Sequence, residues 1–301
     1  MRKKLAHCLL VIAGLIVPAF AATDVAYVNF NGSDANACTR AATCKTITHA
    51  LNVVNVGGVV DIVGSGLYDR FTIIQAVTVK ADPGVVASID VPVSGTGITV
   101  NAASTDFVAL KGLTLHGNGA TGVGFQINSV GRITVEDCFS RNFAYSIVFV
   151  PSTASDLKVT GGAFDGSNTA LYLASSNSHA AIDHTIVYGE ARNGTVSSNQ
   201  GAITSATLVT TVTNSLITGG APDLVQNGVV ASSGTTVLEN DVISQFGDGA
   251  ALLVFSTAYI SSCTFTENFV GIEVLSGTAF TRQNNTITDS NFGTLTPFAA
   301  Q

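Results

Sequence analysis

Charged residues are scarce in this chain. Lys, Arg, Asp and Glu make up 11% of its 301 residues, against roughly 25% in ordinary soluble domains. Disorder does not explain the shortage, because disordered chains also lack the β-branched residues that are plentiful here. The composition therefore predicts a packed, folded chain.

Basic residues are scarcer than acidic ones and form no cluster beyond the N-terminus. Without Arg2, Lys3 and Lys4 the formal net charge changes from −7 to −10. Nucleic-acid binders draw much of their affinity from basic patches. The sequence therefore predicts no nucleic-acid partner.

Long apolar runs are missing beyond the N-terminus, so no transmembrane segment is expected. The one run, residues 8–17, follows three basic residues and precedes Ala19-Phe20-Ala21. This pattern predicts a secretory signal peptide over residues 1–21 and a protein that is secreted or periplasmic. A membrane anchor is the alternative, but the run is shorter than the roughly 20 residues that a spanning helix needs.

Cysteines are few. Cys38 and Cys44 lie six residues apart in a polar stretch, and in an oxidising compartment they predict one local disulfide. Metal thiolates are the alternative, but no third or fourth ligand lies nearby, so no metal site is expected.

What the chain does contain is a repeat. From Leu110 onward it can be aligned with itself in steps of 22 to 26 residues, with one step of 30 near residues 189–200. Five residues into each unit comes a column that is apolar except at Ser140: Leu115, Ser140, Phe164, Val187, Ile217, Ile243, Phe265 and Ile287. A second set of short apolar strands follows in most units.

Leucine-rich repeats have a similar length, but their spaced leucines and helical side are missing. Short strands, polar turns and one column of like residues per unit are typical of a parallel β-helix, an all-β solenoid in which each coil pairs with the next. Cys138 and Cys263 share an inward position five coils apart, which predicts buried free thiols. Asn214, Asn240 and Asn284 share a turn position with His184, and we expect their amides to stack inward.

The N-terminal part is expected to cap the open end of the solenoid. Residues 45–55 have the pattern of a short amphipathic helix that ends at Gly57-Gly58. We expect a signal peptide over 1–21, a cap over 22–58, a β-helix over 59–291 whose first two coils are irregular, and a tail over 292–301. Either this tail folds over the last coil or another subunit covers it; the oligomeric state stays open.

Residues 27–74 resemble the opening of bacterial secreted proteins of the pectate-lyase-like superfamily. The matching residues are Tyr27-Val28, Asn31-Gly32-Ser33-Asp34-Ala35-Asn36, Cys38-Thr39, Cys44-Lys45-Thr46-Ile47, Ala50-Leu51, Gly57-Gly58 with residues 59–63, and Gly66-Leu67-Tyr68 at the family's Gly-x-Tyr position. The resemblance implies a right-handed parallel β-helix. It implies little about activity, because the same opening precedes lyases, hydrolases and surface proteins.

Known catalytic motifs are absent. The Asn-Thr-Asp, Asp-Asp and Gly-His-Gly motifs of polygalacturonase-like members do not occur, and the acids are too scattered for the Ca²⁺ cluster of a lyase. Calcium is therefore suggested by family analogy only, and no other cofactor is expected. No zinc, serine-triad or P-loop spacing occurs.

One outward strip over four coils gathers side chains that could act on a glycan. Position six of these units reads His116, Arg141, Asp165 and Tyr188, and positions one and four add Lys111, Glu136, Asp183 and Phe139. Arg141 would bind a carboxylate or act as a base, with Asp165 and His116 as proton-transfer partners. Tyr188 would stack against a sugar, and the remaining four would contact the substrate. The alternative is a solvated face with ordinary cross-strand ion pairs.

Two functions remain open at this point. One is an exported protein that binds or acts on an extended polysaccharide or cell-surface glycan along its outer face. The other is a non-catalytic surface or structural β-helix, which the missing motifs and the Thr- and Ser-rich outward columns favour. Between an enzyme and a binding protein, the sequence favours binding without catalysis.

Overall fold

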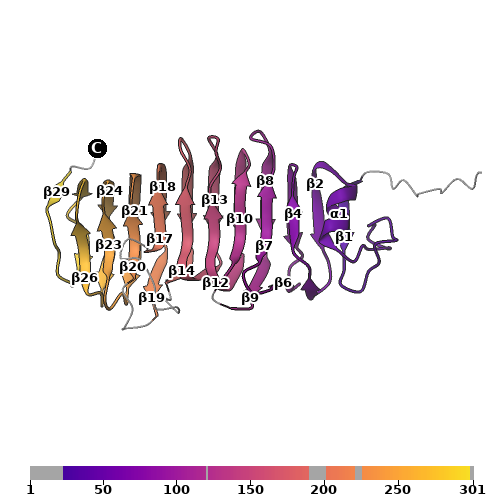
Figure 1. Cartoon of the computed structure of the whole chain (residues 1–301), viewed down its shortest axis with the longest axis horizontal. Coiled ribbons are helices and arrows are strands. Elements are labelled where there is room, and N and C mark those ends of the chain that lie inside the picture. The colour runs from indigo at the N-terminus through magenta and orange to yellow at the C-terminus, as the bar shows by residue number, and fades with distance from the viewer. Residues whose placement is uncertain (1–22, 120, 190–200, 221–225, 299–301) are drawn as a thin grey trace, which may run out of the picture.

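The chain forms one elongated stack of coils, with the N-terminal cap at one end and the C-terminus at the other (Figure 1). The computed structural model describes residues 23–119, 121–189, 201–220 and 226–298. The predicted signal peptide, residues 1–21, lies outside the described residues, as does most of the long loop near residues 189–200.

Every described strand pairs in parallel with strands of neighbouring coils, so that three rows of strands run along the stack. The first row is a sheet of 12 strands: β1 (Thr23–Val28), β2 (Val54–Ile62), β5 (Val77–Ala81), β8 (Phe107–Lys111), β11 (Arg132–Glu136), β13 (Asp156–Thr160), β15 (His179–Asp183), β18 (Leu208–Thr213), β21 (Gly234–Glu239), β24 (Thr257–Ser261), β27 (Thr278–Thr281) and β29 (Leu295–Pro297).

The other two rows belong to one 17-stranded sheet, because β12 and β14 are long enough to run through both. The second row comprises β3 (Gly66–Tyr68), β6 (Ala87–Val91), β9 (Leu113–Gly117), the first parts of β12 (Phe139–Phe149) and β14 (Ala163–Ala174), β16 (Ile186–Gly189), β19 (Leu216–Gly219), β22 (Val242–Ser244), β25 (Thr264–Thr266) and β28 (Thr286–Ile287). The third comprises β4 (Phe71–Ile73), β7 (Thr96–Asn101), β10 (Val123–Ser129), the second parts of β12 and β14, β17 (Gly201–Ala206), β20 (Asn227–Ala231), β23 (Ala250–Val254) and β26 (Val270–Val274).

The predicted parallel β-helix is confirmed, down to the register of its main inward column. Leu115 pairs with Ser140, and each later member of the predicted column pairs with the next as far as Ile287. The column also extends toward the N-terminus through Ile89 and Tyr68. Identical inward positions therefore stack at the ~4.8 Å spacing of paired strands.

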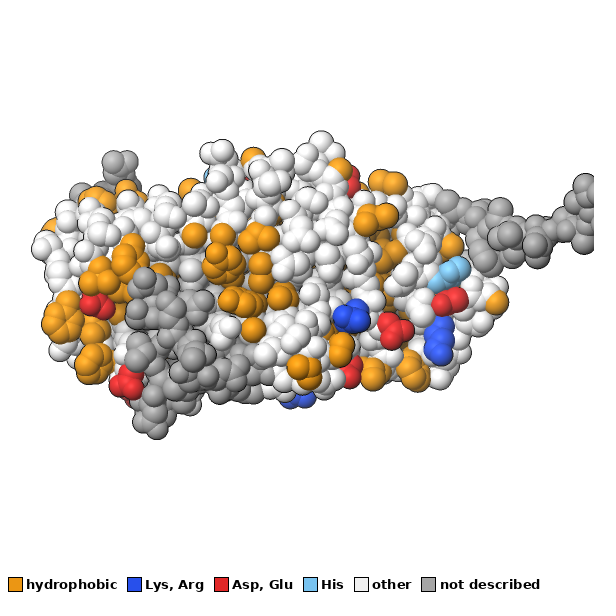
Figure 2. Space-filling model, in the orientation of Figure 1, with side chains coloured by type: hydrophobic (Ala, Val, Ile, Leu, Met, Phe, Trp, Pro, Cys, Tyr) orange, Lys and Arg blue, Asp and Glu red, His pale blue; other side chains and the backbone are white. Residues whose placement is uncertain are grey.

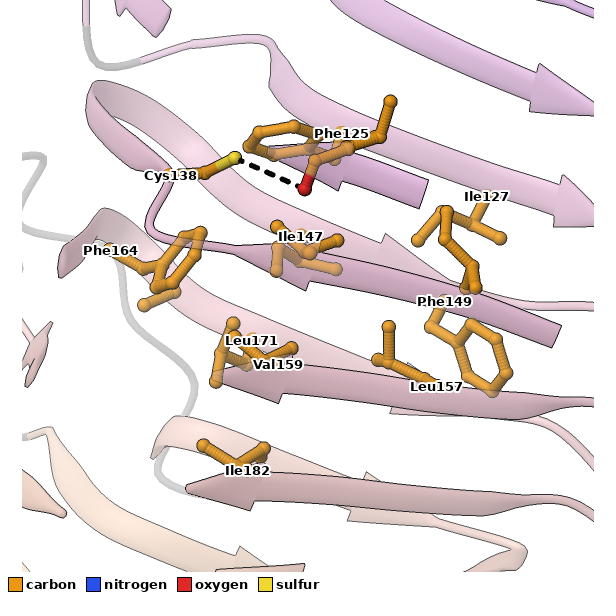
Figure 3. Close-up of a cluster of buried hydrophobic side chains, with 14 of the residues drawn as sticks. Phe125, Ile127, Cys138, Ile147, Phe149, Leu157, Val159, Phe164, Leu171 and Ile182 are labelled. Carbon is orange, nitrogen blue, oxygen red and sulfur yellow. Dashed lines mark hydrogen bonds between the residues drawn. The ribbon is translucent and has the colours of Figure 1, made fainter. Parts of the chain in front are cut away.

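The core fills the space between the three rows. Figure 3 shows Phe125, Ile147 and Leu171 in one file, with Phe164 beside them and Val159 and Leu157 opposite, from the first row. All six side chains are at least 98% buried. Burial of one such side chain contributes roughly 1.5–3 kcal/mol, so the apolar files supply much of the stabilisation of each coil.

The stacked asparagines lie on the outside, so the prediction that they point inward is wrong. Asn214 and Asn240 are exposed and have positive φ angles of 53° and 58°. Asparagine tolerates this left-handed conformation better than most residues. The Asn240 amide still donates to Oδ1 of Asn214 at 2.7 Å, and it is the next residue of the turn, such as Ser215 or Asp241, that points inward.

Cys138 and Cys263 are free and buried, as predicted. They lie on coils separated by five steps of the first row, from β11 to β24. Burial raises the pKa of both thiols to about 12, so both remain protonated and act as small apolar side chains.

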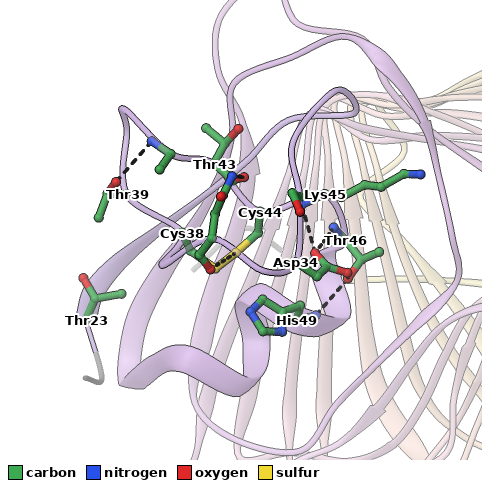
Figure 4. The surroundings of a disulfide bond; sticks show 12 residues. Thr23, Asp34, Cys38, Thr39, Thr43, Cys44, Lys45, Thr46 and His49 are labelled. Carbon is green, nitrogen blue, oxygen red and sulfur yellow. Dashed lines mark hydrogen bonds between the residues drawn. A yellow bond between two sulfur atoms is a disulfide. The ribbon is translucent and has the colours of Figure 1, made fainter. Parts of the chain in front are cut away.

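The N-terminal cap consists of helix α1 (Ile47–Val53) and a loop closed by the Cys38–Cys44 disulfide, which is confirmed (Figure 4). Thr46 caps the helix by accepting from the His49 amide, while Oδ1 of Asp34 accepts from the amides of Lys45 and Thr46 at 2.9 Å. The helix ends before the predicted Gly57-Gly58, because Val54 already pairs with Thr23 and begins β2.

At the other end, the first row continues beyond residue 291. Strand β29 pairs with β27, and Phe298 packs edge-on against the stacked rings of Tyr259 and Phe280. The described part of the C-terminal segment therefore adds one more strand to the stack.

Candidate functional site

A groove crosses the second row of strands over four coils. Its volume is about 480 Å³, and it lies where β9, β12, β14 and β16 present their outward side chains. The residues lining it are Thr114, Leu115, His116, Phe139, Ser140, Arg141, Ala163, Asp165 and Tyr188. Five of the eight side chains proposed from the sequence therefore meet in one groove.

Strand register brings these five together. His116 pairs with Arg141, and Asp165 pairs with Tyr188, so four outward side chains follow one another along the axis. Phe139 lies two residues before Arg141 on β12 and points to the same side. Phe139 and Tyr188 are 50% and 38% exposed, which leaves two aromatic rings open to a ligand.

A bulge separates Arg141 from Asp165 in the ladder. The register between β12 and β14 shifts after Ser140, and Asn142 has a positive φ of 62°. The bulge brings the Asn142 carbonyl so close to Gly117 that a Cβ at residue 117 would lie 2.1 Å from its oxygen. A glycine at this position thus allows the bulge that turns β12 beneath the groove.

A short hydrogen bond in the groove joins Arg141 to His116. Nε of Arg141 donates to Nδ1 of His116 at 2.7 Å. Burial, and then the positive charge of Arg141, lower the pKa of His116, so the ring is neutral at pH 7 and its remaining proton is on Nε2. The imidazole therefore orients the guanidinium and offers the groove an N–H donor.

Arg141 keeps most of its donors for a ligand. Among the described residues, its side chain bonds only to His116 and has no carboxylate within 4.0 Å. The terminal nitrogens of a guanidinium form a rigid fork that fits a carboxylate in two-point fashion. This cation is therefore available to an acidic group in the groove.

Two buried serines that were not predicted as site residues support Asp165 from inside the coil. Oγ of Ser140 donates to Oγ of Ser146 at 2.7 Å, which donates to the Asp165 carbonyl at 2.6 Å. Ser140 and Ser146 are 3% and 0% exposed. The only signal in the sequence was Ser140 itself, the one polar member of an otherwise apolar column.

Ser146→Ala should destabilise the protein by about 1–3 kcal/mol, because it leaves the buried Ser140 hydroxyl and the Asp165 carbonyl without this partner. Urea denaturation measures the loss. Ser88→Ala, at an outward position on β6, is the matched control and should change stability by less than about 0.5 kcal/mol. An equal loss in both variants would show that the buried chain of hydroxyls contributes nothing.

The other three proposed residues lie across the turn, on the first row of strands. Nζ of Lys111 pairs with Oε2 of Glu136 at 2.7 Å, and both side chains are 43% exposed. An exposed pair of this kind contributes little to stability. Asp183 accepts hydrogen bonds from Asn214, His184 and Thr213, which lower its pKa to about 2. These contacts hold Lys111, Glu136 and Asp183 in surface ladders, and none of the three lines the groove.

The residues do not fit the calcium ion that family analogy suggested. Ca²⁺ takes six to eight oxygen ligands, yet within the described ranges the one group of three potential metal ligands close enough together is Cys38, Cys44 and His49. Two of these are joined as a disulfide. The described residues also contain no helix long and apolar enough to cross a membrane.

Charge is sparse on the outside of the solenoid. In Figure 2 the coloured charged side chains are few, and the upper part of the face shown is mostly white and orange. The ion pairs of the described residues involve Lys80, Lys111, Arg132, His179 and His184. Arg141 stands apart from these pairs.

One of the comparisons with known proteins supports the fold. No protein-family model and no curated protein matches the chain. Among solved structures, a pectate lyase, Pel9A, matches with a TM-score of 0.54 at 12% identity, over 93% of this chain and 80% of that one. A rhamnogalacturonan lyase (TM-score 0.46, 14% identity, 85% and 73% of the two chains) and the A-module of the Azotobacter vinelandii mannuronan C-5 epimerase AlgE6 (0.38, 12%, 94% and 98%) are more distant. The chain thus shares the parallel β-helix fold of a pectate lyase.

Proposed function

We propose that the protein binds an extended polysaccharide along its outer face, in the groove over β9, β12, β14 and β16. The observation that carries the proposal is the Arg141 guanidinium, oriented by His116 and without a carboxylate partner among the described residues. The fold itself selects no ligand, since the same architecture serves unrelated functions. The proposal therefore depends on the groove.

The shape and chemistry of the groove suit a sugar chain. It is open and shallow, and it runs along the axis of the stack, as an extended polymer requires. The rings of Phe139 and Tyr188 offer apolar surfaces to sugar faces, and Arg141 offers donors to a carboxylate or hydroxyl. A few polar groups among apolar walls are typical of ligand sites.

The groove favours binding over proton transfer. A guanidinium stays protonated at physiological pH, and the Nδ1 lone pair of His116 already accepts from Arg141. Neither group is then placed as a general base. The roles proposed for Arg141, His116 and Asp165 are accordingly recognition of the sugar chain, with Tyr188 and Phe139 as contact surfaces.

We also propose that the protein is exported. Residues 1–21 have the pattern of a signal peptide, and a disulfide closes the cap. An exported protein meets polysaccharides outside the cytoplasm. The second candidate function, a non-catalytic structural β-helix, is favoured by the small hydroxyl side chains that continue the outward column beyond Tyr188, such as Thr218 and Ser244.

Arg141→Ala should weaken glycan binding about 10- to 100-fold, because a hydrogen bond to a charged group contributes roughly 1.5–3 kcal/mol. A glycan array identifies ligands, and isothermal titration calorimetry measures affinity. Arg132→Ala is the matched control: it removes the same side chain from β11, where it pairs with Asp156 outside the groove. It should bind normally.

Two outcomes would contradict the proposal. One is unchanged affinity of a correctly folded Arg141→Ala variant. The other is failure of the wild-type protein to bind any glycan on the array, which would favour the structural candidate. An absorbance assay for unsaturated uronides, with and without calcium, tests separately whether bound chains are cleaved.

A further inference from the structure

A second cavity adjoins the groove on its N-terminal side. Its volume is about 780 Å³, and it lies over the two irregular coils, where residues of β4, β6 and β7 line it together with residues of the turns that precede β4 and β7. Asp90 lines this cavity and pairs in register with His116, which lines the groove. The two hollows are therefore neighbours on successive coils.

The second cavity is polar, and its acidic side chains outnumber its basic ones. Its ionic side chains are Asp69, Arg70 and Asp90, so its formal charge is −1. Asp90 accepts from the amide of Asn118 at 3.0 Å, and none of the ion pairs within the described ranges neutralises it. The remaining polar side chains are hydroxyls, those of Thr72, Ser94, Thr96 and Thr99.

The order of charges along the axis follows from the register. Arg141 supplies a positive charge on one coil, His116 is neutral on the next, and Asp90 is negative on the coil after that. Successive coils rise by about 4.8 Å, which is comparable with the length of one sugar residue. A polysaccharide that lies along the axis of the solenoid would thus present about one sugar to each coil.

A polysaccharide with a carboxylate on every sugar does not fit this order of charges. One carboxylate would meet Arg141, but a carboxylate two sugars further along would meet Asp90, and like charges in contact oppose binding. A polysaccharide with two or more neutral sugars between its acidic ones could place a carboxylate at Arg141 and leave hydroxyls to Asp90 and the second cavity.

We infer, on the basis of the proposed function, that the binding surface continues from the Arg141 groove across Asp90 into the second cavity, and that its ligand is a heteropolysaccharide in which at least two neutral sugars follow each acidic one. A homopolymeric polyuronate is disfavoured. Arg141 selects the acidic sugar, and Asp90 excludes acidic sugars from the position two coils away.

The test compares three polymers by calorimetry on the full-length mature protein: deacylated gellan, whose linear repeat has one acidic sugar and three neutral ones, polygalacturonate, and the neutral glucan curdlan in soluble form. We expect gellan to bind at least tenfold more tightly per site than polygalacturonate. Asp90→Asn should improve polygalacturonate affinity about fivefold at low salt, because one unscreened repulsion at contact distance corresponds to roughly that factor. The gain should shrink as salt is added.

Controls separate the two proposals. Asp156→Asn removes an equal charge from the first row and should leave the affinity for polygalacturonate unchanged. If polygalacturonate binds as tightly as gellan, or if Asp90→Asn leaves the affinity for polygalacturonate unchanged, the inference is overturned while the proposed function stands. If none of the three polymers and no glycan on the array binds, the proposed function fails and the inference fails with it.

Discussion

Asp241→Asn is expected to abolish a loss of stability that the wild-type protein undergoes between about pH 4 and pH 7. Asp241 is 1% exposed, at the inward turn position between β21 and β22. Burial, and to a smaller extent the nearby charges of Asp183 and Glu239, raise the pKa of its carboxyl to about 7, although it accepts from the amides of Ser215 and Glu239.

The sign of the effect follows from linkage. In the unfolded chain the carboxyl ionises near its ordinary pKa of 3.8, whereas in the folded chain it ionises near 7. Its contribution to stability is therefore fully present below pH 4, declines as the pH rises, and is lost above pH 7. A difference of about three pKa units corresponds to a change on the order of 4 kcal/mol.

An asparagine should fit at residue 241. Asn285 occupies the equivalent turn position two coils further on, where its oxygen accepts from the Cys263 amide at 2.8 Å and its nitrogen donates to Thr281. The measurement is urea denaturation at pH 5 and pH 8 for both proteins. The wild type should be less stable at pH 8 than at pH 5 by about 2–3 kcal/mol, because about two of the three pKa units lie between these pH values. The variant should show little of this difference.

Asp183→Asn provides a control of opposite sign. Hydrogen bonds lower the pKa of Asp183 to about 2, so its carboxylate stabilises the folded chain above pH 4 and loses this contribution as the pH falls toward 2. Its replacement should reduce stability at both pH 5 and pH 8. A wild-type protein equally stable at these two pH values would refute the role assigned to Asp241.

The repeat in the sequence predicted which residues form the inward column, because the strands of successive coils pair in register. Phe265, for example, pairs with Ile243 on one side and Ile287 on the other, so all three side chains point inward. The third row was predicted less completely. Strand β17 lies after the long loop near residues 189–200, which hid the pairing of Ile203 with Leu171 from the alignment.

The candidate site was only partly predictable, since it depends on where turns place outward side chains. Residues in the left-handed conformation, such as Asp137 and His184, separate the first row from the second. Lys111 and Phe139 therefore face different directions, although the repeat predicted that both belong to one outward strip. Asp90 was missed because the first two coils depart from the regular period, and the chain offers no sequence signal for the bulge at Asn142.

Phe164→Ala should cost about 3–5 kcal/mol of unfolding free energy, the largest loss expected from a single core substitution in this protein. The ring is fully buried, lies between Ser140 and Val187 in the inward column, and meets Phe125 edge-on with centroids 6.3 Å apart. In a solenoid each coil contacts only its neighbours, so the cavity cannot be filled by rearrangement of distant parts. Phe139→Ala is the matched control: it removes the same ring from the outward face of the preceding coil, where 50% of the side chain is exposed. Phe139→Ala should lower the free energy of unfolding by less than about 1 kcal/mol and should weaken glycan binding instead. Equal losses of stability in the two variants would contradict the assignment of Phe164 to the core and of Phe139 to the groove.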